Sequence, residues 1–269
     1  MLGSGTPIPD PRRAGPGLAI VVRDRAYLVD AGAGIVRRAA QAAEHGLAAL
    51  SPARLTHLFI THLHSDHTLG LADVMLTPAV MGRPVGLRLF GPPELPAMVD
   101  HLRAAYAVDL QTRAMAEGDS AGYRSLVQVV QPGSCYKDEL VQVTAFSVPH
   151  GTFTHAFGYR FEAQDRVVVV SGDTTPSEAV VQACRGCDVL VHEVYCEAGL
   201  KRLPKHVQRY HRRFHTSGPE LARLATRAHP QLLLLTHLLP FDCDPTFLLG
   251  EVRAGYHGEV AVAEDLQVY

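Results

Sequence analysis

The sequence contains few cysteines, few lysines and little net charge. Of its 269 residues, only five are cysteine and three are lysine, and the formal net charge is −2. The odd, scattered cysteines exclude a disulfide-rich scaffold and indicate reduced thiols. We interpret the C-x-x-C of Cys184 and Cys187 as two partly buried thiols near a helix end. The near-neutral charge argues against broad binding of nucleic acids or membrane surfaces.

Long hydrophobic runs and a leader segment are also missing. The best apolar run, Leu232 to Leu235, is far too short to cross a membrane. No basic stretch followed by an apolar one opens the chain, so we expect no signal peptide and a cytoplasmic location. The length and the apolar content of 47% suffice for a large core. Since no linker-like stretch divides the chain, we predict a single domain over residues 1–269.

The hydrophobic pattern alternates β-prone runs with helix-prone segments after a glycine- and proline-rich start. The order is mixed and has no repeated βαβ rhythm, which predicts an α/β fold. Strands are expected at 18–22, 27–29, 55–61, 87–90, 126–130, 141–148, 158–161, 166–171, 189–192, 232–236 and 259–263. Helices are expected at 35–45, 69–77, 94–107, 177–184, 219–229 and 247–256.

Histidine is present in surplus, with fifteen residues. The strongest local signal is an H-x-H-x-D-H motif directly after a hydrophobic strand, formed by His62, His64, Asp66 and His67. In extended backbone, alternate side chains point the same way, so His62 and His64 can share one metal ion. Asp66 and His67, where the chain turns into the next helix, can face a second ion. Imidazole nitrogen and carboxylate oxygen suit zinc, and manganese or iron also tolerate them.

This motif supplies too few ligands for two metals, so further ligands should lie at other strand ends, where loops on one sheet edge converge. Three positions fit, namely His150, Asp173 and His237, because each follows a β-prone hydrophobic run. Taken singly, a residue in such a position is more often an ordinary solvent-facing loop residue than a metal ligand. Their joint placement favours a metal site.

The order of these motifs, beginning at Asp30, resembles that of the metallo-β-lactamase superfamily over essentially the whole chain. The resemblance implies a four-layer αββα sandwich with a dinuclear metal site at one edge. Asp30 would support the ligand loop without binding metal itself. The implied ligands are His62, His64 and His150 for one ion, Asp66, His67 and His237 for the other, and Asp173 as the bridge between them.

Two further elements are similar to the ribonuclease Z and arylsulfatase-like branch of that superfamily. Glu193 lies in a His-Glu-Val-Tyr strand end, and His215 precedes a helix. In that branch a histidine such as His215, oriented by a glutamate, would protonate the leaving group. The predicted catalytic residues are Asp66, Glu193 and His215. The alternative is that Thr216 or Ser217 only caps the helix and His215 is its neighbour.

Two segments bear on the substrate. Ribonuclease Z enzymes carry a long arm that grips transfer RNA, whereas only 22 residues, which we interpret as a plain hairpin, separate His150 from Asp173. We therefore do not favour tRNA processing. The stretch 201–215 is basic and contains no acid, which fits either a lid that attracts an anionic substrate or a solvated loop.

These observations predict a hydrolase with two divalent metal ions, most simply zinc, with manganese or iron as alternatives. It would cleave a phosphodiester or sulfate ester of a small anionic substrate by attack of metal-bound hydroxide. The alternatives are attack at a carbonyl, as in lactonases, thioesterases and β-lactamases, a ribonuclease Z-like nuclease without the arm, and a metal-stabilised binding protein without turnover. Nucleic acid is a possible but not favoured partner. A homodimer is expected only by analogy.

Overall fold

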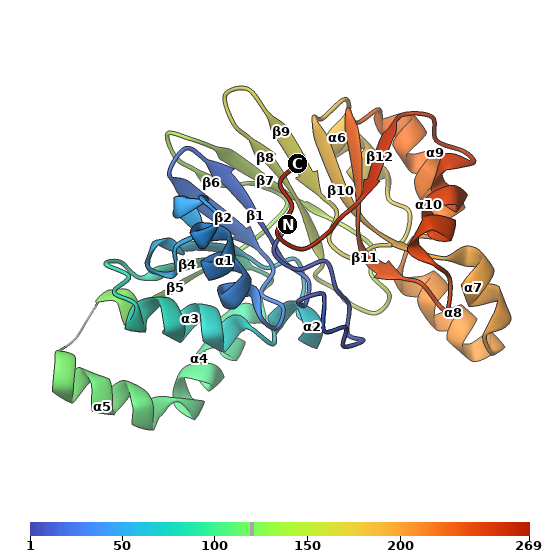
Figure 1. Ribbon diagram of the computed structural model, residues 1–269. Helices are drawn as coiled ribbons and strands as arrows, with labels where there is room; N and C mark the ends of the chain where they lie inside the picture. Colours follow the sequence, from blue (N-terminus) through green and yellow to red (C-terminus); the bar gives the residue numbers. More distant parts are fainter. Residues whose placement is uncertain (119–120) are drawn as a thin grey trace. The chain divides into compact units, whose positions relative to one another are not determined.

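The chain folds into two α/β units, each built around its own sheet (Figure 1). This computed structural model describes residues 1–118 and 121–269. The first unit comprises Met1–Val130 and Glu264–Tyr269, and the second comprises Gln131–Ala263. The α/β class expected from the sequence is confirmed in both units.

The first unit contains a five-stranded sheet in the order β1-β2-β3-β4-β5. Its first two strands form an antiparallel hairpin, and the remaining neighbours are parallel, as helical crossovers require. The strands are β1 Leu18–Val22, β2 Arg25–Val29, β3 His57–Phe59, β4 Leu87–Gly91 and β5 Ser125–Val129.

Amphipathic helices supply the apolar side chains of the first unit's core. In α1 (Ile35–Glu44) the buried residues Ile35, Val36, Ala39 and Ala42 recur at helical spacing on one face. They pack with apolar residues of the strands and of α3. The other helices are α2 Ser65–Thr68, α3 Leu71–Val80, α4 Leu95–Ala105 and α5 Ala107–Glu117, with short 3₁₀ turns η1 Ala48–Leu50, η2 Pro52–Arg54 and η3 Ala121–Tyr123.

The second unit contains a seven-stranded sheet in the order β12-β11-β10-β9-β8-β7-β6. The neighbours from β12 to β9 are parallel, and those from β9 to β6 are antiparallel. The strands are β6 Gly133–Lys137, β7 Gln142–Ser147, β8 Phe157–Glu162, β9 Val167–Val170, β10 Val189–Tyr195, β11 Leu232–Leu239 and β12 Glu259–Val262.

The helices of the second unit differ in how much they bury. α6 and α9 contribute several fully buried apolar residues to the core, whereas α8 buries only Gln208 and Phe214. The helices are α6 Glu178–Cys184, α7 Glu197–Arg202, α8 Lys205–Phe214, α9 Gly218–Ala228 and α10 Pro245–Arg253.

Most predicted elements lie within a few residues of their observed places, and the exceptions have physical reasons. Strand β6 and helices α5, α7 and α8 were not expected, because they bury few apolar side chains and so lack a clear hydrophobic face. The helix expected at 69–77 corresponds to α3, which spans Leu71–Val80, whereas the short helix α2 inside the histidine motif was not expected. The basic stretch 201–215 is not a solvated loop, because α7 and α8 occupy most of it, and its role as a lid stays a prediction.

The expectation of reduced thiols is wrong for four of the five cysteines. Cys184 and Cys187 form one disulfide at the end of α6, and Cys196 and Cys243 form another. The second pair is 47 residues apart in sequence and is brought together only by the parallel pairing of β10 with β11. Cys135 keeps a buried thiol, which donates to the carbonyl oxygen of Val143 at 3.5 Å.

No helix among the described residues is long and apolar enough to cross a membrane.

Candidate metal centre

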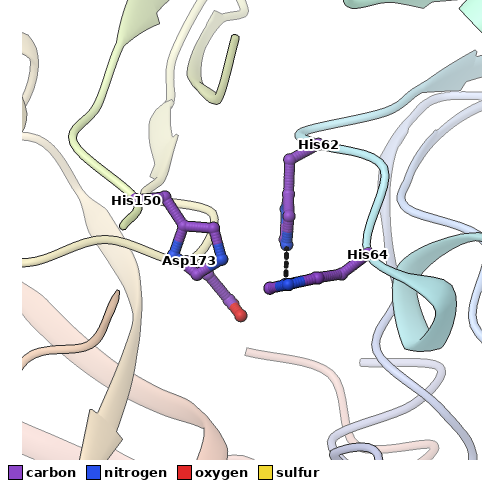
Figure 2. A group of neighbouring side chains, drawn as sticks. All are labelled: His62, His64, His150 and Asp173. Atoms are coloured by element: carbon purple, nitrogen blue, oxygen red, sulfur yellow. Dashed lines mark hydrogen bonds between the residues drawn. The ribbon is translucent and has the colours of Figure 1, made fainter. Parts of the chain in front are cut away.

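The histidine motif occupies the loop and the short helix that follow β3. His62 and His64 lie in the loop, and Asp66 and His67 lie in α2. His62 Nε2 and His64 Nδ1 face each other at 3.0 Å (Figure 2). The His62 and His67 rings are also close, with their centroids 4.2 Å apart. All four motif residues predicted from the sequence therefore lie together within the first unit.

Asp30 holds this loop in place. It follows β2 with a φ of 61°, in the left-handed region, which aspartate tolerates better than most residues. Its Oδ1 accepts the backbone N–H of Thr61 at 2.8 Å, and its Oδ2 accepts His67 Nδ1 at 2.8 Å. His67 Nε2 lies 3.6 Å from Asp66 Oδ2. A carboxylate that accepts from one ring nitrogen orients the other nitrogen as a ligand, which is typical of metal-binding histidines.

The second unit brings together five candidate residues from separate elements. His150 follows β7, Asp173 follows β9, Glu193 lies near the end of β10, His215 separates α8 from α9, and His237 lies in β11. All five are buried. Ligand atoms of Asp173, His215 and His237 lie within 4.8 Å of one another, and so do ligand atoms of His150 and Asp173 (Figure 2).

His237 lies within β11 and not after its end, which corrects the predicted position. Along the pairing with β10, the β11 partners step from Thr236 to Leu238, so that His237 is an extra residue in a β-bulge. Its φ is 45°. Bulges re-aim side chains, and His237 Nε2 lies 3.5 Å from Asp173 Oδ2.

Glu193 and His215 form a buried pair beside Asp173. Glu193 Oε1 accepts the backbone N–H groups of Thr174, at 3.2 Å, and Thr216, at 3.0 Å. His215 Nδ1 lies 3.4 Å from the same oxygen and 3.9 Å from Asp173 Oδ2. Burial, and then the negative charge of Asp173, raise the pKa of Glu193 well above its ordinary value. His215 and Glu193 therefore lie where a proton can be transferred next to the Asp173 carboxylate.

The C-terminal end of α8 holds His150. His150 Nδ1 donates to the carbonyl oxygen of Phe214 at 2.8 Å, and the two rings meet edge-on with centroids 5.1 Å apart. The N–H of Gly151 donates to the carbonyl of Arg213 at 3.1 Å. A Cβ atom at Gly151, which has a φ of 57°, would come within 2.0 Å of the Phe214 ring. Only glycine at position 151 allows the Phe214 ring to pack this close to the backbone.

The turn between α8 and α9 contains the helix cap that the sequence offered as an alternative to a role for His215. Ser217 Oγ accepts the N–H of Glu220, and the Glu220 carboxylate accepts the N–H of Ser217, which completes a capping box. Capping by Ser217 is therefore confirmed. It does not exclude a role for His215, which packs against Glu193 at the same turn.

Sequence reasoning did not find the backbone groups that orient the site in the second unit. The N–H groups of Thr174 and Thr216 and the carbonyl of Phe214 hold Glu193 and His150. Backbone groups leave no residue-type signal. Only the adjacency of Thr174 to Asp173, and of Phe214 and Thr216 to His215, could have drawn attention to them.

The donor sets of both units suit divalent metal ions. They consist of imidazole nitrogens and carboxylate oxygens, which zinc accepts and which manganese and iron tolerate. His67 and His150 each donate through Nδ1, to a carboxylate and a backbone carbonyl respectively, which leaves Nε2 as the lone-pair nitrogen. The residues therefore fit the metals that the resemblance implied.

Comparison with known proteins identifies the family. A family model described as a β-lactamase superfamily domain matches residues 25–238, a range that contains every candidate residue. The chain belongs to the metallo-β-lactamase superfamily. The predicted superfamily and its fold class are confirmed.

Curated relatives place this superfamily member near ribonuclease Z. The protein named ribonuclease Z from Mycobacterium bovis (strain BCG / Pasteur 1173P2) is 33% identical over 244 residues, covering 89% of this chain and 85% of the relative. The predicted branch is thereby confirmed on its ribonuclease Z side.

Solved structures show the same fold. The metallo-β-lactamase fold protein YhfI from Bacillus subtilis matches with a TM-score of 0.73 and 19% identity, covering 98% of this chain and 95% of its own. The short form of human tRNase Z matches with a TM-score of 0.70 and 22% identity, covering 99% and 96%. At these identities the likeness concerns the metallo-β-lactamase fold alone.

Proposed function

We propose that this chain is a ribonuclease Z-like, metal-dependent phosphodiesterase that hydrolyses a phosphodiester bond in RNA. The observation that carries the proposal is the buried pair of His215 and Glu193, 3.4 Å apart, beside Asp173. Such a pair can protonate the leaving oxygen of a phosphodiester, a group that otherwise leaves poorly. The 33% identity with ribonuclease Z supports RNA as the substrate.

RNA as the proposed substrate differs from the small anionic ester that the sequence favoured. A small anionic ester was favoured over nucleic acid because the 22 residues between His150 and Asp173 leave little room for an RNA-gripping arm. Those residues do contain the plain hairpin of β8 and β9. The relatives that cover most of this chain are nevertheless named ribonuclease Z, and they favour a phosphodiester over a sulfate ester or a carbonyl substrate.

We propose two divalent ions, most simply zinc, as the resident metals. When bound, the two ions acidify a water molecule and neutralise charge on the phosphoryl oxygens. Since the family match runs across both units, we assign their donor sets to one site in a single domain over residues 1–269. The proposed ligands are His62, His64 and His150 for one ion, Asp66, His67 and His237 for the other, and Asp173 for both.

The proposed proton transfers use three residues of the chain. Glu193, fixed by two backbone N–H groups, orients the His215 imidazole, and His215 gives its proton to the leaving oxygen. Asp66 is buried and can accept a proton from the attacking water. The protein would thus supply an acid and a base from different units.

Metal analysis coupled to a substrate panel tests the proposal. The panel contains a 3′-extended tRNA precursor, bis(p-nitrophenyl) phosphate, p-nitrophenyl sulfate, a homoserine lactone and a cephalosporin. We expect about two ions per chain and turnover of the RNA and of the phosphate diester. Turnover of only the sulfate, the lactone or the cephalosporin would overturn the proposal.

The paired cysteines remove the reduced-thiol argument for the cytoplasm. We still propose a cytoplasmic location, because the proposed substrate is a cellular RNA, and cell fractionation checks it. A homodimer remains a proposal by analogy, which light scattering in solution tests.

A further inference from the structure

Helix α8 presents a strongly basic surface next to the catalytic candidates. Its sequence, KHVQRYHRRF, contains no acid. Lys205, Arg209 and Arg213 are exposed and recur at every fourth position, so they share one side of the helix, and we call them the basic face of α8. With a rise of about 1.5 Å per residue, their Cα atoms are spaced roughly 6 Å apart along the axis.

Other basic residues nearby are already engaged. Lys201 of α7 and Arg212 of α8 lie 3.3 Å and 3.0 Å from Glu197 Oε1. Glu197 therefore neutralises part of the charge next to the basic face and ties α7 to α8. A row of positive charges that recurs along one helix suits a repeating polyanion better than a single small anion.

An exposed aromatic ring lies beside the basic face. Tyr210 is 48% exposed, and one side of its ring stacks on Phe214, with centroids 4.5 Å apart and an angle of 25° between the planes. Because Phe214 is buried and packs on His150, the tyrosine ring rests on a rigid support. An exposed ring among cations is the arrangement on which single-stranded nucleic acids stack their bases.

The same helix leads directly into the proposed proton donor. α8 ends at Phe214, and His215 follows as its C-cap. The Phe214 carbonyl holds His150. A strand bound along α8 would thus be fixed relative to His150 and His215 through a short, rigid connection.

We propose that the basic face of α8 binds the phosphate backbone of single-stranded RNA next to the scissile bond, while Tyr210 stacks on one of its bases. This inference rests on the proposed ribonuclease function and adds a surface that holds the substrate without the arm. Stacking and backbone contacts are both tolerant of sequence, so binding depends on single-strandedness and charge.

An anionic membrane is the competing partner for a basic helix, and α8 lacks what that partner needs. A helix that lies in a membrane surface buries an exposed apolar face in the lipid. In α8 the apolar Phe214 is already buried in the protein, and Val207 is partly buried. Nucleic acid is therefore favoured.

Binding of a labelled single-stranded RNA of about twelve nucleotides to the metal-loaded protein, followed by anisotropy over a salt series, tests the surface. In Lys205→Gln/Arg209→Gln/Arg213→Gln, three phosphate contacts are lost. The negative slope of log K against log salt should therefore become less steep by about 2. In Tyr210→Ala, the affinity should fall about five-fold or more, while Tyr210→Phe should retain it.

The matched control removes three exposed arginines from other elements, in Arg37→Gln/Arg54→Gln/Arg223→Gln. We expect this variant to bind the RNA like the parent protein. An equal loss in the control variant, or unchanged binding in both α8 variants, would overturn the proposal. So would α8-dependent binding to phosphatidylserine vesicles with RNA binding unaffected.

Turnover separates this inference from the proposed function. The α8 variants should lose kcat/KM on a 3′-extended tRNA precursor by about ten-fold or more, and much less on bis(p-nitrophenyl) phosphate, which has a single phosphate and no strand that could lie along α8. If the parent protein hydrolyses neither substrate, the proposed function fails, whereas the salt slopes still decide whether α8 binds RNA.

Discussion

The two units contribute their candidate residues in opposite ways. In the first unit, His62, His64, Asp66 and His67 come from six consecutive positions after one strand. In the second, the candidates come from β10, β11 and three separate loops or turns, spread over almost ninety residues. A contiguous motif keeps its members together whatever surrounds it. A dispersed set exists only when the sheet is correctly paired.

The units also differ in how they support these residues. In the first unit a single side chain, Asp30, accepts from both Thr61 and His67. In the second unit, backbone N–H and carbonyl groups hold Glu193 and His150. Support by one side chain can be removed by one substitution, whereas backbone support survives most substitutions.

The largest effect is expected from Asp173→Ala in the second unit. Asp173 is 3% exposed and lies near both His215 and His237. Its loss should abolish turnover and lower metal affinity by more than the roughly 10- to 100-fold typical of supporting residues, so that the metal content of the purified protein falls. Metal analysis by mass spectrometry and the diesterase rate measure this. Asp165→Ala, in the exposed β8–β9 turn, is the control, and full metal loading in the Asp173 variant would contradict the assignment.

His215→Ala should keep the metals and slow the chemistry. Loss of a general acid typically costs about 10²- to 10⁴-fold, and the loss should be greater for RNA than for p-nitrophenyl esters, whose leaving group needs no proton. Single-turnover rates on both substrates measure it, with exposed His257→Ala as the control. Equal rates for the parent and the His215 variant on RNA would exclude the acid role.

Asp30→Asn tests whether the first unit depends on one supporting side chain. The amide cannot accept from both Thr61 and His67, so metal affinity should fall about 10- to 100-fold. Competition with a chelator measures the affinity. Asp24→Asn, an exposed substitution in the β1–β2 turn, should leave it unchanged. An unaltered affinity in both variants would show that the loop holds its shape without Asp30.

The smallest effect is expected from Ser217→Ala, which removes a side-chain cap and leaves the backbone supports of the second unit in place. The loss should cost about 1 kcal/mol of unfolding free energy. For a chain of this size, that corresponds to a fall in Tm of about 2 °C. Scanning calorimetry measures it. Ser217→Thr should recover most of the loss, and failure to do so would point to a role beyond capping.

The contrast between the units also explains what the sequence could predict. The histidine motif and the order of the later motifs were sufficient to find the superfamily and every candidate residue, because these residue types are chemically distinctive. The Cys196–Cys243 disulfide and the helical state of 201–215 were missed. The first depends on strand pairing, and the second on a polar helix that buries little.

The position of His237 illustrates the limit of local patterns. A hydrophobic run followed by a histidine predicts a strand that stops and a loop that begins, yet β11 continues to Leu239. The extra residue is visible only in the pairing with β10. A period of two, read along one strand, contains no information about a bulge against its neighbour.

The bulge at His237 also bears on how this chain can change by insertion and deletion. Residues before and after it follow opposite alternations, so deleting His237 would restore an uninterrupted ladder between β10 and β11. The deletion variant would have the more regular sheet and would lack a candidate ligand. Regularity and activity are therefore opposed at this one position, and a design method that rewards ideal strand pairing would remove the histidine first.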